Sequence, residues 1–528
     1  MKGLSGTGTM IRLILRRDRI RIPLWIAAIA GVIVGSAASV TEVYATQEEI
    51  NAYASSVGEN PAVVAMNGPA YALDTIGGVV VYETTLIGVV GVALMSLLFV
   101  TRHTRTEEET GRAELIQAGV VGGHARLAAT LVVVAATNLL LGGLLAIGLA
   151  SIELPLGGSV AFGLSMAGLG LVFAALAAVA SQITEYGRAA ASLTGAVFGA
   201  AYVLRAAGDV GSGFLSWFSP IGWAQAMRAF GTERWWTLVL TVGFAGLLTV
   251  VAFVLESRRD LGGGLIPARL GPPNASDALA RPLGLAARLQ RAGLVGWGAG
   301  IFLLGLAFGS MGRSVEELVE SNPELAEILV QQGASLTDSF LSTGLVIVAL
   351  TVSGCAVQSM LRLRGEETAG RVESLLATAT SRNHWAGSHA TIAFVGSAVV
   401  VALGGLGTGL SHSLVAGDWG QLPRLVGAAL VNVPAVWLLA AFALALFGLI
   451  PRAVAATWGV LAFCLVVGVL GQSLDLPEWA MNLSPFQHTP ALPADDLTMA
   501  PLLAMSAVAA GLASIGFASF RRRDLTLS

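Results

Sequence analysis

The residues best suited to chemistry in this chain are charged side chains that recur in one pattern. Segments 105–114 and 364–373 both fit R-x-E-E-x-x-G-R-x-E, although the chain is otherwise strongly apolar. Carboxylate and guanidinium groups can bind a partner through charged contacts. The repetition predicts two equivalent docking surfaces for a soluble partner, in water on one side of a bilayer. The candidate residues are Glu107, Glu108, Gly111, Arg112 and Glu114, and in the second copy Glu366, Glu367, Gly370, Arg371 and Glu373.

Both copies of the motif contain a glycine where a helix is expected. Helical spacing would place Glu107, Gly111 and Glu114 on one side. A glycine inside a helix costs about 1 kcal/mol relative to alanine. We therefore expect a bend, or the close approach of another backbone, at Gly111 and Gly370. If the charges served only to set topology, acids would not be expected in loops that otherwise carry arginine.

Catalytic and metal-binding patterns are missing from the sequence. A phosphate-binding loop G-x-x-x-x-G-K-[ST] is absent, and the only lysine is Lys2. The two cysteines, Cys355 and Cys464, fall in separate apolar stretches, and the six histidines show no ligand spacing. We therefore expect no metal site, no cofactor bound by this chain and no enzymatic activity.

The composition indicates an integral membrane protein. Of the 528 residues, 55% are hydrophobic and 12% charged, whereas soluble domains carry about 25% charge. Apolar runs of about 20 residues span a bilayer, and inside lipid they must be helical. The predicted spans lie near 23–41, 83–101, 127–150, 159–181, 189–207, 236–255, 294–311, 341–361, 389–411, 425–449, 453–471 and 499–519.

The arginines are distributed unequally between alternate loops. Several precede the first span, and others fall in every second loop and at the C-terminus, while the intervening loops are acidic. Because positive loops stay in the cytoplasm, both termini are predicted to be cytoplasmic, in a bacterial plasma membrane. Met10–Arg21 separates apolar and basic sides, which predicts an elbow helix in the membrane plane, and 285–291 begins the second half similarly.

Further landmarks recur in the same order in both halves. Ser219-Pro220 matches Ser484-Pro485, and Arg258-Arg259-Asp260 matches Arg522-Arg523-Asp524. An even number of spans per half inserts both halves the same way round. The predicted fold is therefore all-α, with about twelve transmembrane helices in two tandem six-helix halves. The expected division is 1–261 for the first half, 262–291 for a cytoplasmic linker and second elbow, and 292–528 for the second half.

The motif resembles that of permeases of the ABC-2 type exporter family, in the duplicated actinobacterial form described as polyketide-antibiotic or multidrug exporters. That family carries E-E-x-x-G-x-x-E-x-L after the second span. Leu375 fills the final position in the second copy and Ile116 replaces it in the first. The second copy continues with Arg382 in a similar small-polar-arginine-aromatic segment. The first departs from it at 121–124, so equal coupling by the two halves does not follow.

The resemblance implies halves like those of type V exporters and a re-entrant segment before each last span. It also implies two copies of a separate soluble nucleotide-binding ATPase, which would bind ATP and Mg and dock on the motif loops. Substrates would be small lipophilic or amphipathic molecules, and nucleic acid is not expected as a partner. A path along the second and fifth spans would be apolar and aromatic. The candidate lining residues are Phe198, Tyr202, Trp458 and Phe463.

The alternative is a proton-coupled secondary multidrug transporter with the same number of spans. Such a protein needs ionisable side chains in the middle of the membrane. The predicted spans are nearly free of them, since Glu83 and Arg205 fall near predicted ends. An intramembrane enzyme and a non-transporting scaffold are weaker alternatives, because no catalytic grouping is present.

Overall fold

A computed structural model describes residues 2–58, 61–117, 119, 121–267, 271, 273–320, 335–470 and 477–524. The structure is 80% helical, and the described ranges contain no strand. Within these ranges, twelve helices are long and apolar enough to cross a membrane, and each overlaps one of the predicted spans. The prediction of an all-α membrane protein is therefore confirmed.

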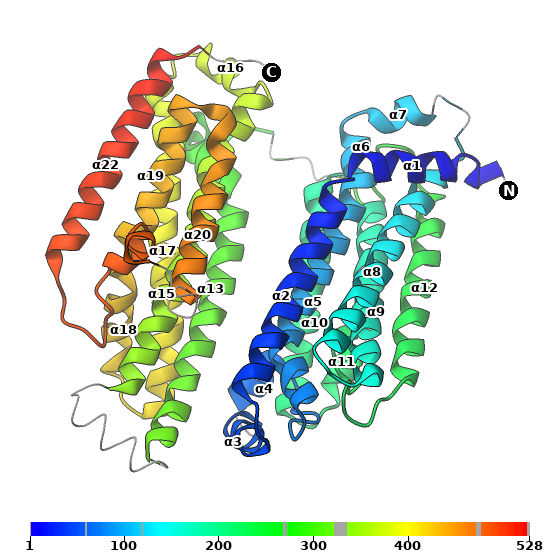
Figure 1. The fold of residues 1–528 in the computed structure, drawn as a ribbon. Helices are drawn as coiled ribbons and strands as arrows, with labels where there is room; N and C mark the ends of the chain where they lie inside the picture. The colour runs from blue at the N-terminus through cyan, green and yellow to red at the C-terminus, as the bar shows by residue number, and fades with distance from the viewer. Residues whose placement is uncertain are drawn as a thin grey trace. The chain divides into compact units, whose positions relative to one another are not determined.

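The chain forms two compact units, Met1–Gly271 and Pro272–Ser528 (Figure 1). Their boundary falls inside the segment 262–291 that we predicted to be a linker, while the exact limits of that segment stay a prediction. The six spans of unit 1 are buried over 22, 67, 44, 78, 22 and 17% of their apolar windows, in chain order. The corresponding values in unit 2 are 22, 72, 44, 61, 28 and 22%. This repeated profile supports the duplication, with the second and fourth spans forming the core of each unit.

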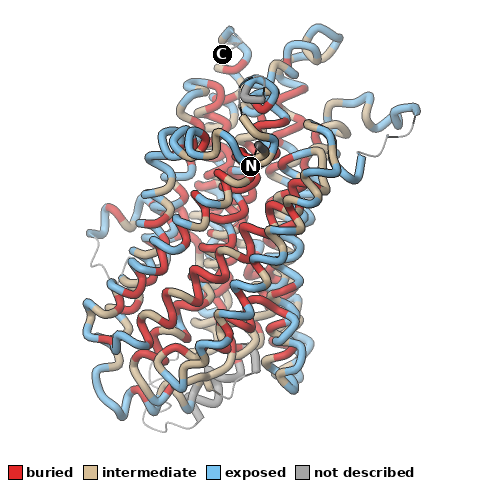
Figure 2. The backbone as a smooth tube through the Cα atoms, turned by 90° about the vertical axis from the view of Figure 1, so that its right-hand side faces the viewer, coloured by how far each residue is buried: buried red, intermediate tan, exposed pale blue. Residues whose placement is uncertain are grey.

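Unit 1 is built around its second and fourth spans. Its spans are α2 (Arg21–Val43), α5 (Ile76–His103), α8 (Ala125–Ser151), α9 (Leu156–Ile183), α10 (Gly187–Val210) and α12 (Trp236–Glu256). A Cβ atom on Gly163 of α9 would lie 2.2 Å from the carbonyl oxygen of Gly142 in α8. Small residues thus let the two backbones touch, which is how helices pack where lipid removes the hydrophobic driving force. Figure 2 shows buried residues on the inner sides of the helices.

Unit 2 repeats this arrangement. Its spans are α13 (Pro282–Glu320), α15 (Leu336–Thr368), α17 (Arg382–Ala416), α18 and α19 (Gln421–Leu430 and Val433–Leu449), α20 (Thr457–Leu470) with the preceding turn η4 (Pro451–Ala456), and α22 (Met499–Arg522). Added Cβ atoms on Gly305 and Gly309 would lie 2.2 and 2.1 Å from backbone oxygens of α17. Close backbone contact therefore holds this pair of helices together as well.

Only one of the two predicted elbow helices is a separate element. Helix α1 (Thr7–Arg17) lies across the end of unit 1 and is separated from α2 by a turn at Asp18 (Figure 1). Asp18 is fully buried and pairs there with His103 and Arg102. The second elbow, predicted at 285–291, is wrong. This segment is the first part of α13, because its alanine, leucine, arginine and glutamine residues favour helix and nothing interrupts it before the span.

The segments predicted to re-enter the membrane fold as short helices. In unit 1 they are η2 (Leu215–Phe218) and α11 (Pro220–Gln225), and α11 packs on α9 and α12 with its first five residues buried. The hydroxyl of Ser219 accepts a hydrogen bond from the backbone of Ile221 and so begins α11. In unit 2 the equivalents are α21 (Glu478–Met481) and η5 (Pro485–His488).

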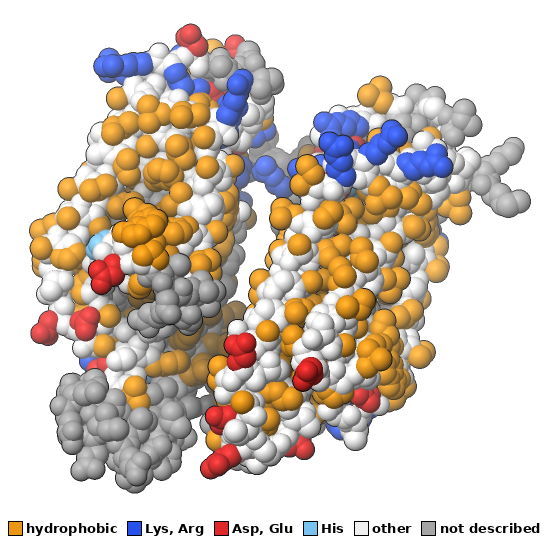
Figure 3. Space-filling view, viewed as in Figure 1, with side chains coloured by type: hydrophobic (Ala, Val, Ile, Leu, Met, Phe, Trp, Pro, Cys, Tyr) orange, Lys and Arg blue, Asp and Glu red, His pale blue; other side chains and the backbone are white. Residues whose placement is uncertain are grey.

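We call the end of each unit that carries the repeated acidic motif its motif end. In unit 1, Figure 3 shows blue arginine side chains at this end, apolar side chains along the helices and red acidic side chains at the opposite end. That opposite end of unit 1 also carries α3 (Gln47–Val57) and α4 (Pro61–Asn67). The acidic residues 316, 317, 320, 324 and 327, predicted for the equivalent loop of unit 2, lie outside the residues whose side chains are described.

Candidate functional site

The motif forms a helix end, a turn and a short second helix in each unit. In unit 1, α5 is followed by α6 (Arg105–Glu109) and α7 (Arg112–Gln117), and in unit 2, α15 is followed by α16 (Arg371–Leu376). Gly111 and Gly370, which lie between the helices, both have φ = +70°. The predicted grouping of Glu107, Gly111 and Glu114 on one helix face is therefore wrong, because α6 ends at Glu109.

The conformation of the motif glycines explains their presence. A left-handed backbone costs a residue with a side chain about 1–2 kcal/mol, and glycine avoids this cost. Among the described residues, no heavy atom beyond the immediate chain neighbours lies within 4 Å of a Cβ built on Gly111 or Gly370. Of the two expected explanations, the bend is therefore confirmed and the close approach of another backbone is wrong.

In unit 1 the second motif glutamate is buried among arginines. The guanidinium of Arg259, three residues after the end of α12, donates two hydrogen bonds to the Glu108 carboxylate, at 2.8 and 2.7 Å. Arg105 and Arg126 also pair with this carboxylate. Arg259 additionally donates to the side chain of Gln182 at the end of α9, at 2.7 Å. Glu108 and Arg259 together thus join the ends of four spans: α5, α8, α9 and α12.

Unit 2 contains the same arrangement. Arg523, immediately after α22, donates two hydrogen bonds to the carboxylate of Glu367, at 2.7 and 2.8 Å. Arg364 pairs with the same carboxylate at 3.4 Å. We call the two pairs, Glu108–Arg259 and Glu367–Arg523, the Glu–Arg clamps. Two parallel charge-assisted hydrogen bonds define direction as well as distance, so each clamp holds the motif segment against the end of the sixth span.

The first motif glutamates are bound differently in the two units. Glu107 pairs with Arg17 of α1, which attaches the elbow helix to the motif. Glu366 instead accepts hydrogen bonds from Arg371 of its own motif, at 2.6 and 3.1 Å. Glu366 also pairs with Arg362 of α15 at 3.5 Å. The first motif glutamate of unit 1 is therefore bound to the elbow, whereas that of unit 2 is bound by α15 and its own motif.

The structure divides the predicted docking residues into two groups. Glu107, Glu108, Glu366 and Glu367 are buried in ion pairs within their own units, so they do not offer a free acidic surface. Arg112, Glu114, Arg371 and Glu373, on α7 and α16, are exposed. Arg382 begins α17 and donates to main-chain oxygens at the end of α22, so it stabilises the same region of unit 2.

The four candidate path residues are divided between the two units, and a path that they share stays a prediction. Phe198 packs on Phe173 of α9, with ring centroids 5.4 Å apart, and the Tyr202 hydroxyl donates to the backbone oxygen of Met66 at 2.8 Å. Both side chains therefore point into unit 1. Trp458 and Phe463 belong to unit 2, where they are 42% and 36% exposed on α20.

Arg205 holds two helices of unit 1 together, a role that the sequence pattern did not indicate. Its buried guanidinium donates to the backbone oxygens of Val64, Ala65 and Met66 at the end of α4, at 2.8–3.3 Å. It also pairs with Asp209 at 3.3 Å. A cation suits the C-terminal end of a helix, so Arg205 fastens α4 to α10.

In the part of the chain that the structure describes, twelve apolar helices fall into two similar units that each carry the motif, as in a duplicated multi-pass membrane protein. Residues 279–521 match the family model described as the C-terminal domain of multidrug efflux system permease Rv1217c. Over its full length the chain is 40% identical to the multidrug efflux system permease protein Rv1217c of Mycobacterium tuberculosis (strain ATCC 25618 / H37Rv). The alignment covers 99% of this chain and 96% of that protein. The chain belongs to this family of multidrug efflux permeases, which confirms the recognition made from the acidic motif.

Proposed function

We propose that this chain is the membrane-spanning subunit of an ATP-driven exporter of lipophilic or amphipathic compounds. The observation that carries the proposal is the pair of Glu–Arg clamps, because the same linkage recurs at the motif end of both units. The related protein is named as a multidrug efflux system permease, which supports the substrate class.

In this proposal a separate ATPase subunit binds to the exposed residues of α7 and of α16, with one copy at each motif. A displacement of α7 reaches α6 directly, and the clamp passes it from Glu108 to the end of α12. Such a partner shifts the conformational equilibrium only by its differential affinity for the two states. ATP and Mg would bind to the partner, and this chain would itself catalyse no reaction, since it lacks a phosphate-binding loop.

The distribution of charged residues gives the proposed orientation of the chain in the membrane. The motif ends, both termini and the Arg-rich loops would face the cytoplasm of the bacterium. The opposite end of unit 1, with the acidic residues of α3, would face outward. In this orientation the clamps would lie next to the compartment that contains ATP.

The first test is to isolate the tagged chain from its native membranes in mild detergent and identify the proteins that co-purify. We expect an ATPase at about two copies per permease, one for each motif. If no ATPase co-purified, even after cross-linking, the proposal would be rejected. The proton-coupled alternative would then explain efflux better.

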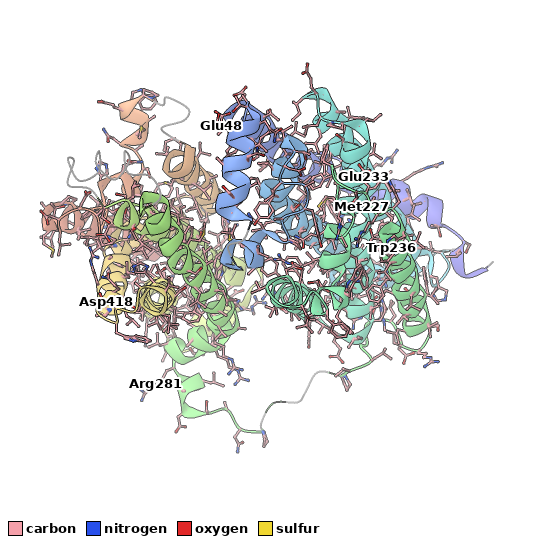
Figure 4. All side chains as sticks on the ribbon, turned by 90° about the horizontal axis from the view of Figure 1, so that it is seen from below. Glu48, Met227, Glu233, Trp236, Arg281 and Asp418 are labelled. Carbon is pink, nitrogen blue, oxygen red and sulfur yellow. The ribbon has the colours of Figure 1, made fainter. Side chains whose placement is uncertain are left out.

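A second test uses the exposed motif residues, because changing the buried glutamates would also disturb folding. Glu114→Arg and Glu373→Arg should each reduce drug-stimulated ATP hydrolysis by the complex, roughly tenfold if the contact contributes 1–2 kcal/mol. Glu48→Arg is the matched control, since Glu48 is an exposed acid at the opposite end of unit 1 (Figure 4). Equal turnover in all three variants would remove α7 and α16 from the coupling role.

A further inference from the structure

One carboxylate inside a span has no role in the clamps. Glu83 lies seven residues after the start of α5, roughly 10 Å along the helix axis, and it is exposed. Every other carboxylate in the described spans lies within three residues of the end of its span. Among the described residues, no arginine or histidine forms an ion pair with Glu83. Glu83 lies beside Tyr53 of α3, level with the end of α2, whose C-cap residue is Tyr44. An ionisable group on a spanning helix is rare, and it commonly marks a substrate or ion site.

Two tyrosines from other segments surround this carboxylate. Tyr53 of α3 donates its hydroxyl hydrogen bond to Glu83. Tyr44, which follows α2, packs on Tyr53 with ring centroids 4.9 Å apart and an interplanar angle of 54°. Burial and the negative charge of Glu83 raise the pKa of both tyrosines above their usual value. Both rings therefore lie within the field of the carboxylate and remain neutral at physiological pH.

The segments around Glu83 carry mostly negative charge. Between Arg21 and Arg102 the chain contains no lysine or arginine, and its acids there are Glu42, Glu48, Glu49, Glu59, Asp74 and Glu83. Three arginines from other segments lie at this end of unit 1, namely Arg205, Arg228 and Arg234, and the first two bind other groups. Arg205 binds Asp209 and the end of α4, and Arg228 lies over the ring of Tyr71, 4.4 Å from its centroid. Such a region attracts cations and repels anions.

The carboxylate begins an apolar stripe along a helix that is otherwise mostly buried. Ile87, Leu94 and Leu98 of α5 are 41–45% exposed, and their spacing places them with Glu83 on one side of the helix. At the matching place in unit 2, α15 carries Ser342 and Thr343. At this position of the second span, the acid is therefore present in unit 1 and absent from unit 2.

We propose that Glu83, Tyr53 and Tyr44 form a recognition site for lipophilic organic cations. The carboxylate would offset the positive charge, the tyrosine rings would contact it through their π faces, and the stripe on α5 would accept the apolar body. This inference rests on the proposed export of lipophilic compounds and specifies the charge of one substrate class.

The test is direct binding to the purified full-length chain in phosphatidylcholine nanodiscs, measured by equilibrium dialysis. The probe is tetraphenylphosphonium, and its anionic counterpart of nearly equal shape, tetraphenylborate, is the control. We expect saturable binding of the cation alone, weakened roughly tenfold or more by Glu83→Gln. Tyr53→Phe keeps the ring and should cost less. Glu109→Gln, which removes an exposed acid at the opposite, motif end of unit 1, should change affinity by less than about twofold.

Equal affinity of the wild-type chain and Glu83→Gln would overturn the proposal, as would saturable binding of the anion or of neither ion. Recovery of part of the affinity in Glu83→Asp, at an unchanged thermal midpoint, would separate a binding role from a folding role. The dialysis experiment needs no ATPase. A failure to co-purify an ATPase would therefore refute the proposed energy source and leave the cation site standing.

Discussion

At the scale of the residue, the buried motif glutamates differ in the number of their partners. Glu108 binds three arginines, whereas Glu367 binds two. A buried ion pair adds little net stability compared with apolar packing, but removing one partner leaves an unpaired charge, at a cost of about 3–5 kcal/mol. The loss of one charge in either clamp should therefore lower the free energy of unfolding strongly.

Replacing these carboxylates by amides gives a test of the clamps. Glu108→Gln and Glu367→Gln should both lower the thermal midpoint of the detergent-solubilised chain, and Glu108→Gln more so, because it strands three arginines. The exposed neighbour Glu109 provides the control, and Glu109→Gln should leave the midpoint nearly unchanged. In a double-mutant cycle, adding Arg523→Met to Glu367→Gln should cost less than the two single changes together. Additive costs would show that the pair does not interact.

At the scale of the element, the bends at Gly111 and Gly370 decide where α7 and α16 begin. Gly→Ala at either position should destabilise its short helix by about 1–2 kcal/mol through the backbone alone, because no neighbouring atom obstructs the methyl group. Gly→Asn should cost less, since asparagine tolerates the left-handed conformation. Hydrogen exchange of α7 and α16 would measure this difference. A larger cost for asparagine than for alanine would contradict the backbone explanation.

The elbow and the fifth spans show where reasoning about single elements is insufficient. The amphipathic pattern of 10–21 correctly predicts α1, but a similar pattern at 285–291 continues directly into α13. The difference is Asp18, whose burial against α5 holds the turn in unit 1. Likewise, Phe198 and Tyr202 of α10 face their own unit, because Phe198 packs on Phe173 and Tyr202 donates to the backbone oxygen of Met66.

At the scale of the whole molecule, the two compact units predict independent folding. A protease site inserted after Gly271, which is exposed and outside any helix, should allow cleavage without unfolding. After separation in detergent, each fragment should keep its helical circular dichroism and unfold in one cooperative transition, because each has its own hydrophobic core. Aggregation of either fragment on separation would show that its core depends on the other unit.

Much of this architecture is encoded locally. The twelve spans follow from composition, because a stretch of about 20 apolar residues can bury its backbone polar groups in lipid only as a helix. The duplication follows from landmarks in the same order, and the need for glycine at 111 and 370 follows from its recurrence. The clamps depend on tertiary structure. Both partners of each pair belong to repeated landmarks, yet Glu108 and Arg259 are 151 residues apart, and Glu367 and Arg523 are 156 apart. Only the packing of six helices brings their ends together, and that burial turns expected surface charges into internal ion pairs.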